Sequence, residues 1–97
     1  MAGNTHYEDQ VTAGSGGVMT QEVGVVTGDL TIRTEAAVDD AQAVRVQVQY
    51  TGAEEWYTLT GSPVALAGRS AEQVHQAALQ AACAGADGGV TAAHLRY

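Results

Sequence analysis

The sequence predicts an α+β fold, in which a four- to five-stranded antiparallel meander sheet carries one helix on one face, in two layers. Two patterns carry this prediction. Apolar residues recur at every second position over much of residues 18–60, which is typical of strands with one buried face. A single run with helical periodicity follows Ser70, and its small apolar residues allow a helix to approach a valine-rich sheet closely.

The length of the chain limits it to one hydrophobic core. With 97 residues, we expect one domain. Residues 1–17 are polar and small and end in Gly14-Ser15-Gly16-Gly17. Such a segment buries too little apolar surface to offset the entropy lost on ordering. The sequence therefore predicts a flexible N-terminal leader over residues 1–17 and a single α+β domain over residues 18–97.

The first two strands are expected to form a hairpin. Residues 22–27 and 30–34 alternate in character and are separated by Gly28-Asp29. This pair favours a two-residue turn, because glycine supplies the positive φ that the turn requires. The second strand is expected to continue to Val38.

The clearest strand covers residues 44–51. Its apolar positions alternate with polar ones and are Val44, Val46, Val48 and Tyr50. Pairing Val38 with Val44 continues the apolar face of the preceding strand. A fourth strand is expected at residues 56–60. If Thr51 pairs with Trp56, the indole lies on the polar face of the sheet, away from the helix.

The helix has recognisable ends. Ser70 is a favoured N-cap, and Gln73 stands three positions later, as in a capping box. Gly85 is expected to end the helix. A stripe at helical spacing faces the sheet and consists of Ala71, Val74, His75, Ala78, Leu79 and Ala82. Cys83 is expected to be a small buried side chain, and residues 90–97 to form a short last strand.

The charge balance excludes two classes of partner. The chain has no lysine, four arginines and eleven carboxylates, for a formal net charge of -7. Because affinity for nucleic acids and for anionic membranes depends on cations, we expect neither partner. The single cysteine excludes an intrachain disulfide and fits a reducing compartment. Since the first residues also lack a signal-peptide pattern, we expect a cytoplasmic protein.

The sequence contains no motif for catalysis. His6, His75 and His94 lack the spacing of metal ligands. The glycines of residues 14–17 precede a predicted strand, so they do not form a phosphate cradle at a helix N-terminus. We therefore expect no catalytic residue, no metal site and no cofactor.

An exposed tryptophan beside an arginine is typical of residues that anchor interfaces. The predicted strands place one such tryptophan on the polar face of the sheet, where it has no role in the core. The candidate interface consists of Trp56, Arg45, Gln47, Gln49 and Thr58.

Three functions remain open at this point. The first is a non-catalytic interaction or regulatory module that self-associates as a homodimer through the Trp56 face or a strand edge. The second is an acidic inhibitor of the immunity-protein or antitoxin type, which neutralises a basic protein partner. The third is a small enzyme or ligand-binding protein that uses His75, His94 or the tyrosines in a pocket completed by a dimer.

Overall fold

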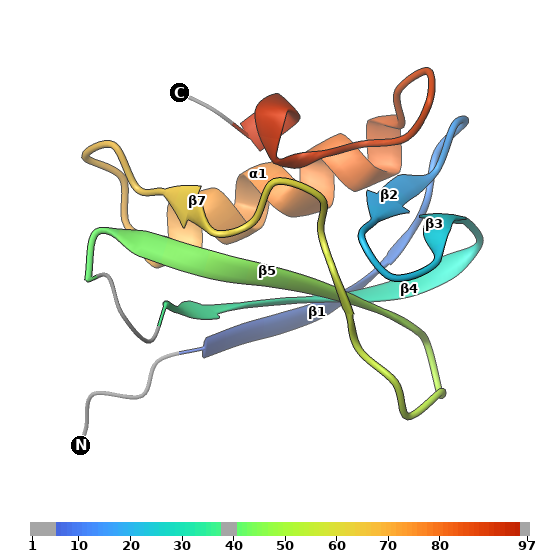
Figure 1. The fold of residues 1–97 in the computed structure, drawn as a ribbon, viewed down its shortest axis with the longest axis horizontal. Coiled ribbons are helices and arrows are strands. Elements are labelled where there is room, and N and C mark those ends of the chain that lie inside the picture. Colours follow the sequence, from blue (N-terminus) through green and yellow to red (C-terminus); the bar gives the residue numbers. More distant parts are fainter. Residues whose placement is uncertain (1–5, 38–40, 96–97) are drawn as a thin grey trace.

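The structure, a computed structural model, describes residues 6–37 and 41–95 (Figure 1). It confirms the α+β class, with an antiparallel sheet and one long helix packed on it. The strands are β1 (His6–Thr12), β2 (Val18–Thr20), β3 (Gly24–Val26), β4 (Asp29–Ala36), β5 (Ala43–Tyr50), β6 (Tyr57–Thr58) and β7 (Val64–Ala65). The helices are α1 (Ala71–Ala84) and the short 3-10 helix η1 (Ala92–Leu95).

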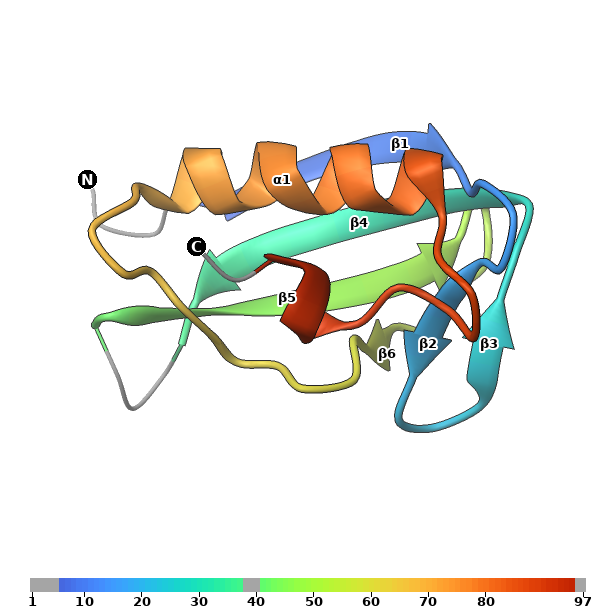
Figure 2. The ribbon, with the colours of Figure 1, turned by 90° about the horizontal axis from the view of Figure 1, so that it is seen from above.

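The main sheet has five strands. Four of them follow the order β1-β4-β5-β6, and the fifth, β7, pairs with another part of β5. A second, two-stranded sheet consists of β2 and β3. Figure 2 shows α1 running along β1 and β4, with the C-terminal segment and η1 beside it over β5. The core lies between these two layers and contains mainly valine, with Leu30, Ile32, Leu59 and Leu95 as its larger members.

The β4–β5 pairing differs from the prediction by a shift of two residues. Val44 lies opposite Ala36, and Val48 lies opposite Ile32. The predicted partner Val38 lies outside the described residues. Because side chains alternate with a period of two, an even shift leaves every residue on its predicted face. The same shift applies to β6, where Tyr57 pairs with Val48.

The predicted hairpin around Gly28-Asp29 is wrong. Residues 24–26 pair with β2 in the small sheet, and β4 pairs with β1 instead. The Thr20 side chain stabilises the turn between β2 and β3, since its hydroxyl donates to the Gly24 carbonyl at 2.7 Å. Gly28 has the expected positive φ of 87°, but there the chain passes from the small sheet into the large one.

The predicted leader is corrected over residues 6–17. Residues 6–12 form β1, which pairs with β4 along its whole length. The glycine-rich segment packs on the end of α1, where the Gly14 amide donates to the Ala82 carbonyl at 2.8 Å. The glycines are needed for this contact, because a Cβ atom at Gly16 would lie 1.9 Å from the Ala86 carbonyl oxygen. Residues 1–5 lie outside the described part of the chain.

The helix agrees with the sequence at both ends. Ser70 and Gln73 form a complete capping box, and Gly85 is the C-cap. The members of the predicted stripe are buried or half-buried against the sheet. Cys83, in contrast, is exposed and not buried as predicted. It follows directly after the buried Ala82 and so points away from the sheet.

The predicted last strand is also corrected. Val90 forms a single parallel bridge with Val18, and residues 92–95 then form η1. Local side-chain bonds favour this turn. The His94 Nδ1 atom accepts from the Thr91 amide at 3.0 Å, and the Thr91 hydroxyl accepts from the Ala93 amide at 3.2 Å. Tyr97 lies outside the described residues.

Candidate functional site

The face of the main sheet that points away from α1 is the candidate site. Along the middle of β4 and β5 the even-numbered residues, such as Ile32 and Val46, are buried on the helix side, so the odd-numbered residues point the other way. We call this surface the outer sheet face. It consists of Glu8, Gln10, Thr31, Arg33, Glu35, Arg45, Gln47, Gln49, Trp56 and Thr58.

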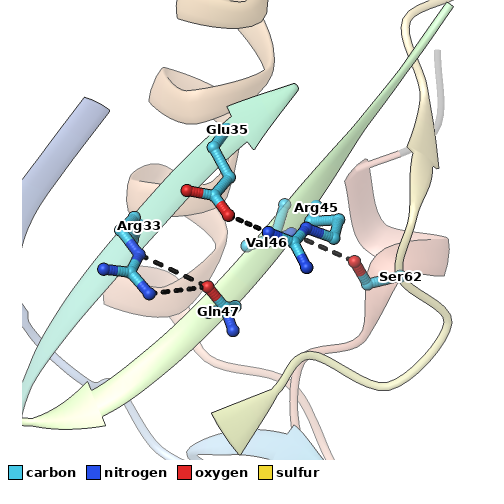
Figure 3. Close-up of polar contacts among 6 residues, drawn as sticks. All are labelled: Arg33, Glu35, Arg45, Val46, Gln47 and Ser62. Carbon is cyan, nitrogen blue, oxygen red and sulfur yellow. Dashed lines mark hydrogen bonds and ion pairs between the residues drawn. The ribbon is translucent and has the colours of Figure 1, made fainter. Parts of the chain in front are cut away.

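Polar side chains are paired across the strands of this face. Figure 3 shows Arg33 of β4 opposite Gln47 of β5, with Nη2 donating to the Gln47 amide oxygen at 2.9 Å. The next pair is an ion pair between Glu35 and Arg45. These pairs fix the direction of both guanidinium groups, which otherwise end flexible side chains.

Trp56 lies on this face, as predicted. The guanidinium carbon of Arg33 is 4.1 Å from the centroid of the indole ring, which is a cation–π geometry. Trp56 is half-buried, so part of the ring remains available to a partner. The contacts hold the indole in one position without removing it from the surface.

The structure brings all predicted interface residues to one face and adds two that the sequence reasoning missed. Arg45, Gln47 and Gln49 follow one another along β5, and Thr58 pairs with Gln47. The two additions are Arg33, which contacts Trp56, and Glu35, which pairs with Arg45. The sequence did contain a signal for both residues, because Arg33 and Glu35 alternate with uncharged residues of the same strand and therefore lie on its polar face.

Glu22 lies at the border of the site, next to Thr58. It lies in the turn between β2 and β3, and its two carboxylate oxygens accept from the Thr58 amide at 2.7 Å and the Thr58 hydroxyl at 2.8 Å. These hydrogen bonds to the charged form lower the pKa of Glu22, and the backbone amide has the largest effect. Glu22 therefore ties the small sheet to β6.

The lowered pKa of Glu22 predicts a pH-dependent contribution to stability. A carboxylate with a depressed folded-state pKa stabilises fully above its ordinary pKa of 4.5 and loses this effect as the pH falls below it. Glu22→Gln is therefore expected to lower the free energy of unfolding at pH 7, measured by urea denaturation, by less than about 1 kcal/mol because the site is exposed. The difference from wild type is expected to shrink at about pH 3. An equal difference at both pH values contradicts the assignment.

His75 belongs to the core and not to the outer sheet face. It is fully buried, and its Nε2 atom lies 2.8 Å from the Asp9 carboxylate and its Nδ1 atom 2.9 Å from the Thr34 hydroxyl. Because a carboxylate only accepts, Nε2 carries a proton. The Thr34 hydroxyl is itself fully buried, so a substrate has no access to it. The geometry is that of a satisfied polar network that joins α1 to β1 and β4.

A groove of about 570 Å³ lies beside β7, between the segment of residues 60–69 and residues 91–93. Its lining is mostly small and apolar, with the Arg69 side chain among it. Arg69 donates to the carbonyl oxygens of Leu66 and Leu95 and so joins the segment after β7 to η1. Neither His75 nor His94 belongs to the groove lining in the described part of the chain.

The described residues contain no cluster of three or more histidine, cysteine or acidic side chains arranged to hold a metal ion. Within the same part of the chain, no helix has the length and hydropathy needed to cross a bilayer. Comparison with protein-family models, with curated protein sequences and with solved structures finds no match. The interpretation of the site therefore depends on the residues of this chain.

Proposed function

We propose that this chain is a non-catalytic interaction module that self-associates as a homodimer through the outer sheet face. The observation that carries the proposal is the position of Trp56, a half-buried indole fixed on a polar sheet face by Arg33. Tryptophan and arginine are the residues most enriched among those that dominate binding energy at interfaces. Since the indole does not fill the core, we expect it to contribute free energy when a partner binds.

The distribution of charge supports a second copy as the partner. Of the three arginines in the described part of the chain, Arg33 and Arg45 lie on the outer sheet face, and Arg69 is bonded to carbonyl groups elsewhere. The same face also carries Glu8 and Glu35. In a twofold contact, each patch meets its own copy, so a charged patch is complementary to itself only if it holds both signs of charge. This face satisfies that condition, whereas copies with a net charge of -7 repel elsewhere.

The required contact is small relative to the molecule. A stable interface buries about 800 Å² on each partner, which is about a seventh of the total accessible surface of 5302 Å². Two sheets that pack face to face keep their strand directions within about 30° of each other. The proposed dimer is therefore a pair of main sheets in contact, with α1 of each copy on the outside. Its location is proposed to be the cytoplasm.

The test is the solution mass of the wild-type protein and of Trp56→Ala, measured by light scattering over a range of concentrations. We expect the wild-type protein to approach twice the monomer mass of 9.9 kDa. Trp56→Ala is expected to weaken the dimer by at least about tenfold, as found for central interface residues.

Tyr50→Ala is the matched control. Tyr50 is 42% exposed, but it lies on the face of β5 that carries Val48, so its loss is expected to leave the dimer intact. A wild-type monomer at all concentrations contradicts self-association. A dimer that Trp56→Ala does not weaken contradicts the outer sheet face as its contact.

A further inference from the structure

β1 is an edge strand with one side open. It pairs with β4 over all of residues 6–12, and no strand in the described part of the chain lies on its other side. The opposite edge of the sheet is different, because β6, Ser62 and β7 follow one another along β5. Figure 3 shows Ser62 at this edge, where its hydroxyl accepts from the Val46 amide. Among the strands that the structure describes, the β1 edge alone has a long row of backbone groups without a neighbouring strand.

The register shows which amides point outward at this edge. The Ala13 amide donates to the Gly28 carbonyl, in continuation of the β1–β4 ladder. Amides along a strand point to alternate sides, so those of Tyr7, Asp9 and Val11 face β4. The amides that face away from β4 are therefore those of Glu8, Gln10 and Thr12.

The side chains along the edge favour a particular kind of partner. Glu8 is exposed on the outer sheet face, and Asp9 is exposed next to it on the helix side. Tyr7 and Val11 are half-buried on the helix side and leave apolar surface beside the edge. An added strand places its side chains alternately on these two faces. It therefore meets the Glu8 carboxylate on the outer side and, on the inner side, the apolar surface of Tyr7 and Val11 with the Asp9 carboxylate between them.

We propose that the β1 edge binds an extended segment of another protein, in which basic and apolar residues alternate, by adding it as a further strand of the sheet. This goes beyond self-association through the outer sheet face, because it uses the open backbone edge of β1, which shares only the side chains of Glu8 and Gln10 with that face. Strand addition to an exposed edge takes its affinity from backbone hydrogen bonds and its selectivity from alternate side chains. Two copies of the β1 edge carry the same carboxylates, so the charge favours a basic partner over a second copy.

The probe is a synthetic peptide of alternating lysine and valine, with blocked ends. The first control peptide has the same sequence but N-methyl groups on the amides of one side, which removes the donors that an added strand needs. The second control has glutamate in place of lysine. We expect the unmodified lysine-valine peptide to bind and both control peptides not to bind. We also expect added salt to weaken the binding of the lysine-valine peptide.

Amide hydrogen exchange, measured by NMR, locates the contact. In the free protein, the amides of Tyr7, Asp9 and Val11 are expected to be protected by β4. With the peptide bound, the amides of Glu8, Gln10 and Thr12 are expected to become protected as well. Protection limited to the outer sheet face, or equal binding of the N-methylated peptide, overturns the proposal.

Two substitutions complete the test. Gln10→Pro removes one outward amide but no bond to β4, and proline is tolerated at such edge positions, so we expect the fold to persist and the peptide to lose binding. Gln10→Ala is its control and is expected to bind as wild type does. Glu8→Gln keeps the backbone and is expected to weaken binding by about threefold to fivefold, the effect of an exposed ion pair. Unchanged affinity in both Gln10→Pro and Glu8→Gln overturns the proposal.

Discussion

The Gly16→Ala variant is expected to unfold at a much lower urea concentration than the wild-type protein. Gly16 has a φ of +90°, which strains any residue with a Cβ atom, and this Cβ would lie 1.9 Å from the Ala86 carbonyl oxygen. The backbone after α1 must therefore move away. Strain and overpacking together are expected to cost about 3 kcal/mol or more. Urea unfolding followed by circular dichroism measures this cost.

Gly52→Ala separates the two causes. Gly52 has the same φ of +90°, but no atom lies within 4 Å of the position that its Cβ would take. The variant therefore carries only the backbone strain and is expected to lose about 1 kcal/mol. Equal losses in Gly16→Ala and Gly52→Ala would contradict close packing of the glycine-rich segment on α1.

The second large loss of stability is expected when the buried imidazole of His75 is removed. His75→Leu leaves the Thr34 hydroxyl without its partner inside the core, where both side chains are fully buried. We expect a loss of about 2–3 kcal/mol in the free energy of unfolding, since a buried polar group without a hydrogen bond is costly. Asp9 contributes less to this loss, because its half-exposed side chain can turn to water.

Thr34→Val tests whether the loss arises from the hydroxyl. Valine has nearly the same shape as threonine, so the double variant His75→Leu with Thr34→Val contains no orphaned group at this contact. Its cost is expected to be smaller than the sum of the two single costs by about 1 kcal/mol or more. Strictly additive costs would show that the contact between Nδ1 and the Thr34 hydroxyl does not contribute.

The sequence predicts the face of the sheet on which a side chain lies better than it predicts which residues pair between strands. Both shifted pairings, β4 with β5 and β5 with β6, are offset by two residues, so the side of each residue was predictable. For the same reason, the alternation predicts correctly that Trp56 lies on the outer sheet face. The helix was predictable at both ends, because capping at Ser70 and Gly85 depends on neighbouring residues alone.

The elements that were missed depend on contacts between distant residues. β1 lacks an apolar alternation because Asp9 occupies an inner position, where its partner is His75 from α1. The segment of residues 14–17 resembles a linker in composition, but its glycines serve a close approach to the end of α1. Neither contact leaves a local pattern in the sequence. Arg33 was missed as a site residue because its contact with Trp56 reaches across β5, which lies between β4 and β6.

The most direct test of the proposed dimer is an isotope-filtered nuclear Overhauser experiment on an equal mixture of labelled and unlabelled protein. We predict contacts between the Trp56 indole of one copy and the outer sheet face of the other, around Arg33 and Gln47. Contacts between copies that involve only α1 or the β1 edge, or a sample that is monomeric at millimolar concentration, would contradict the proposal.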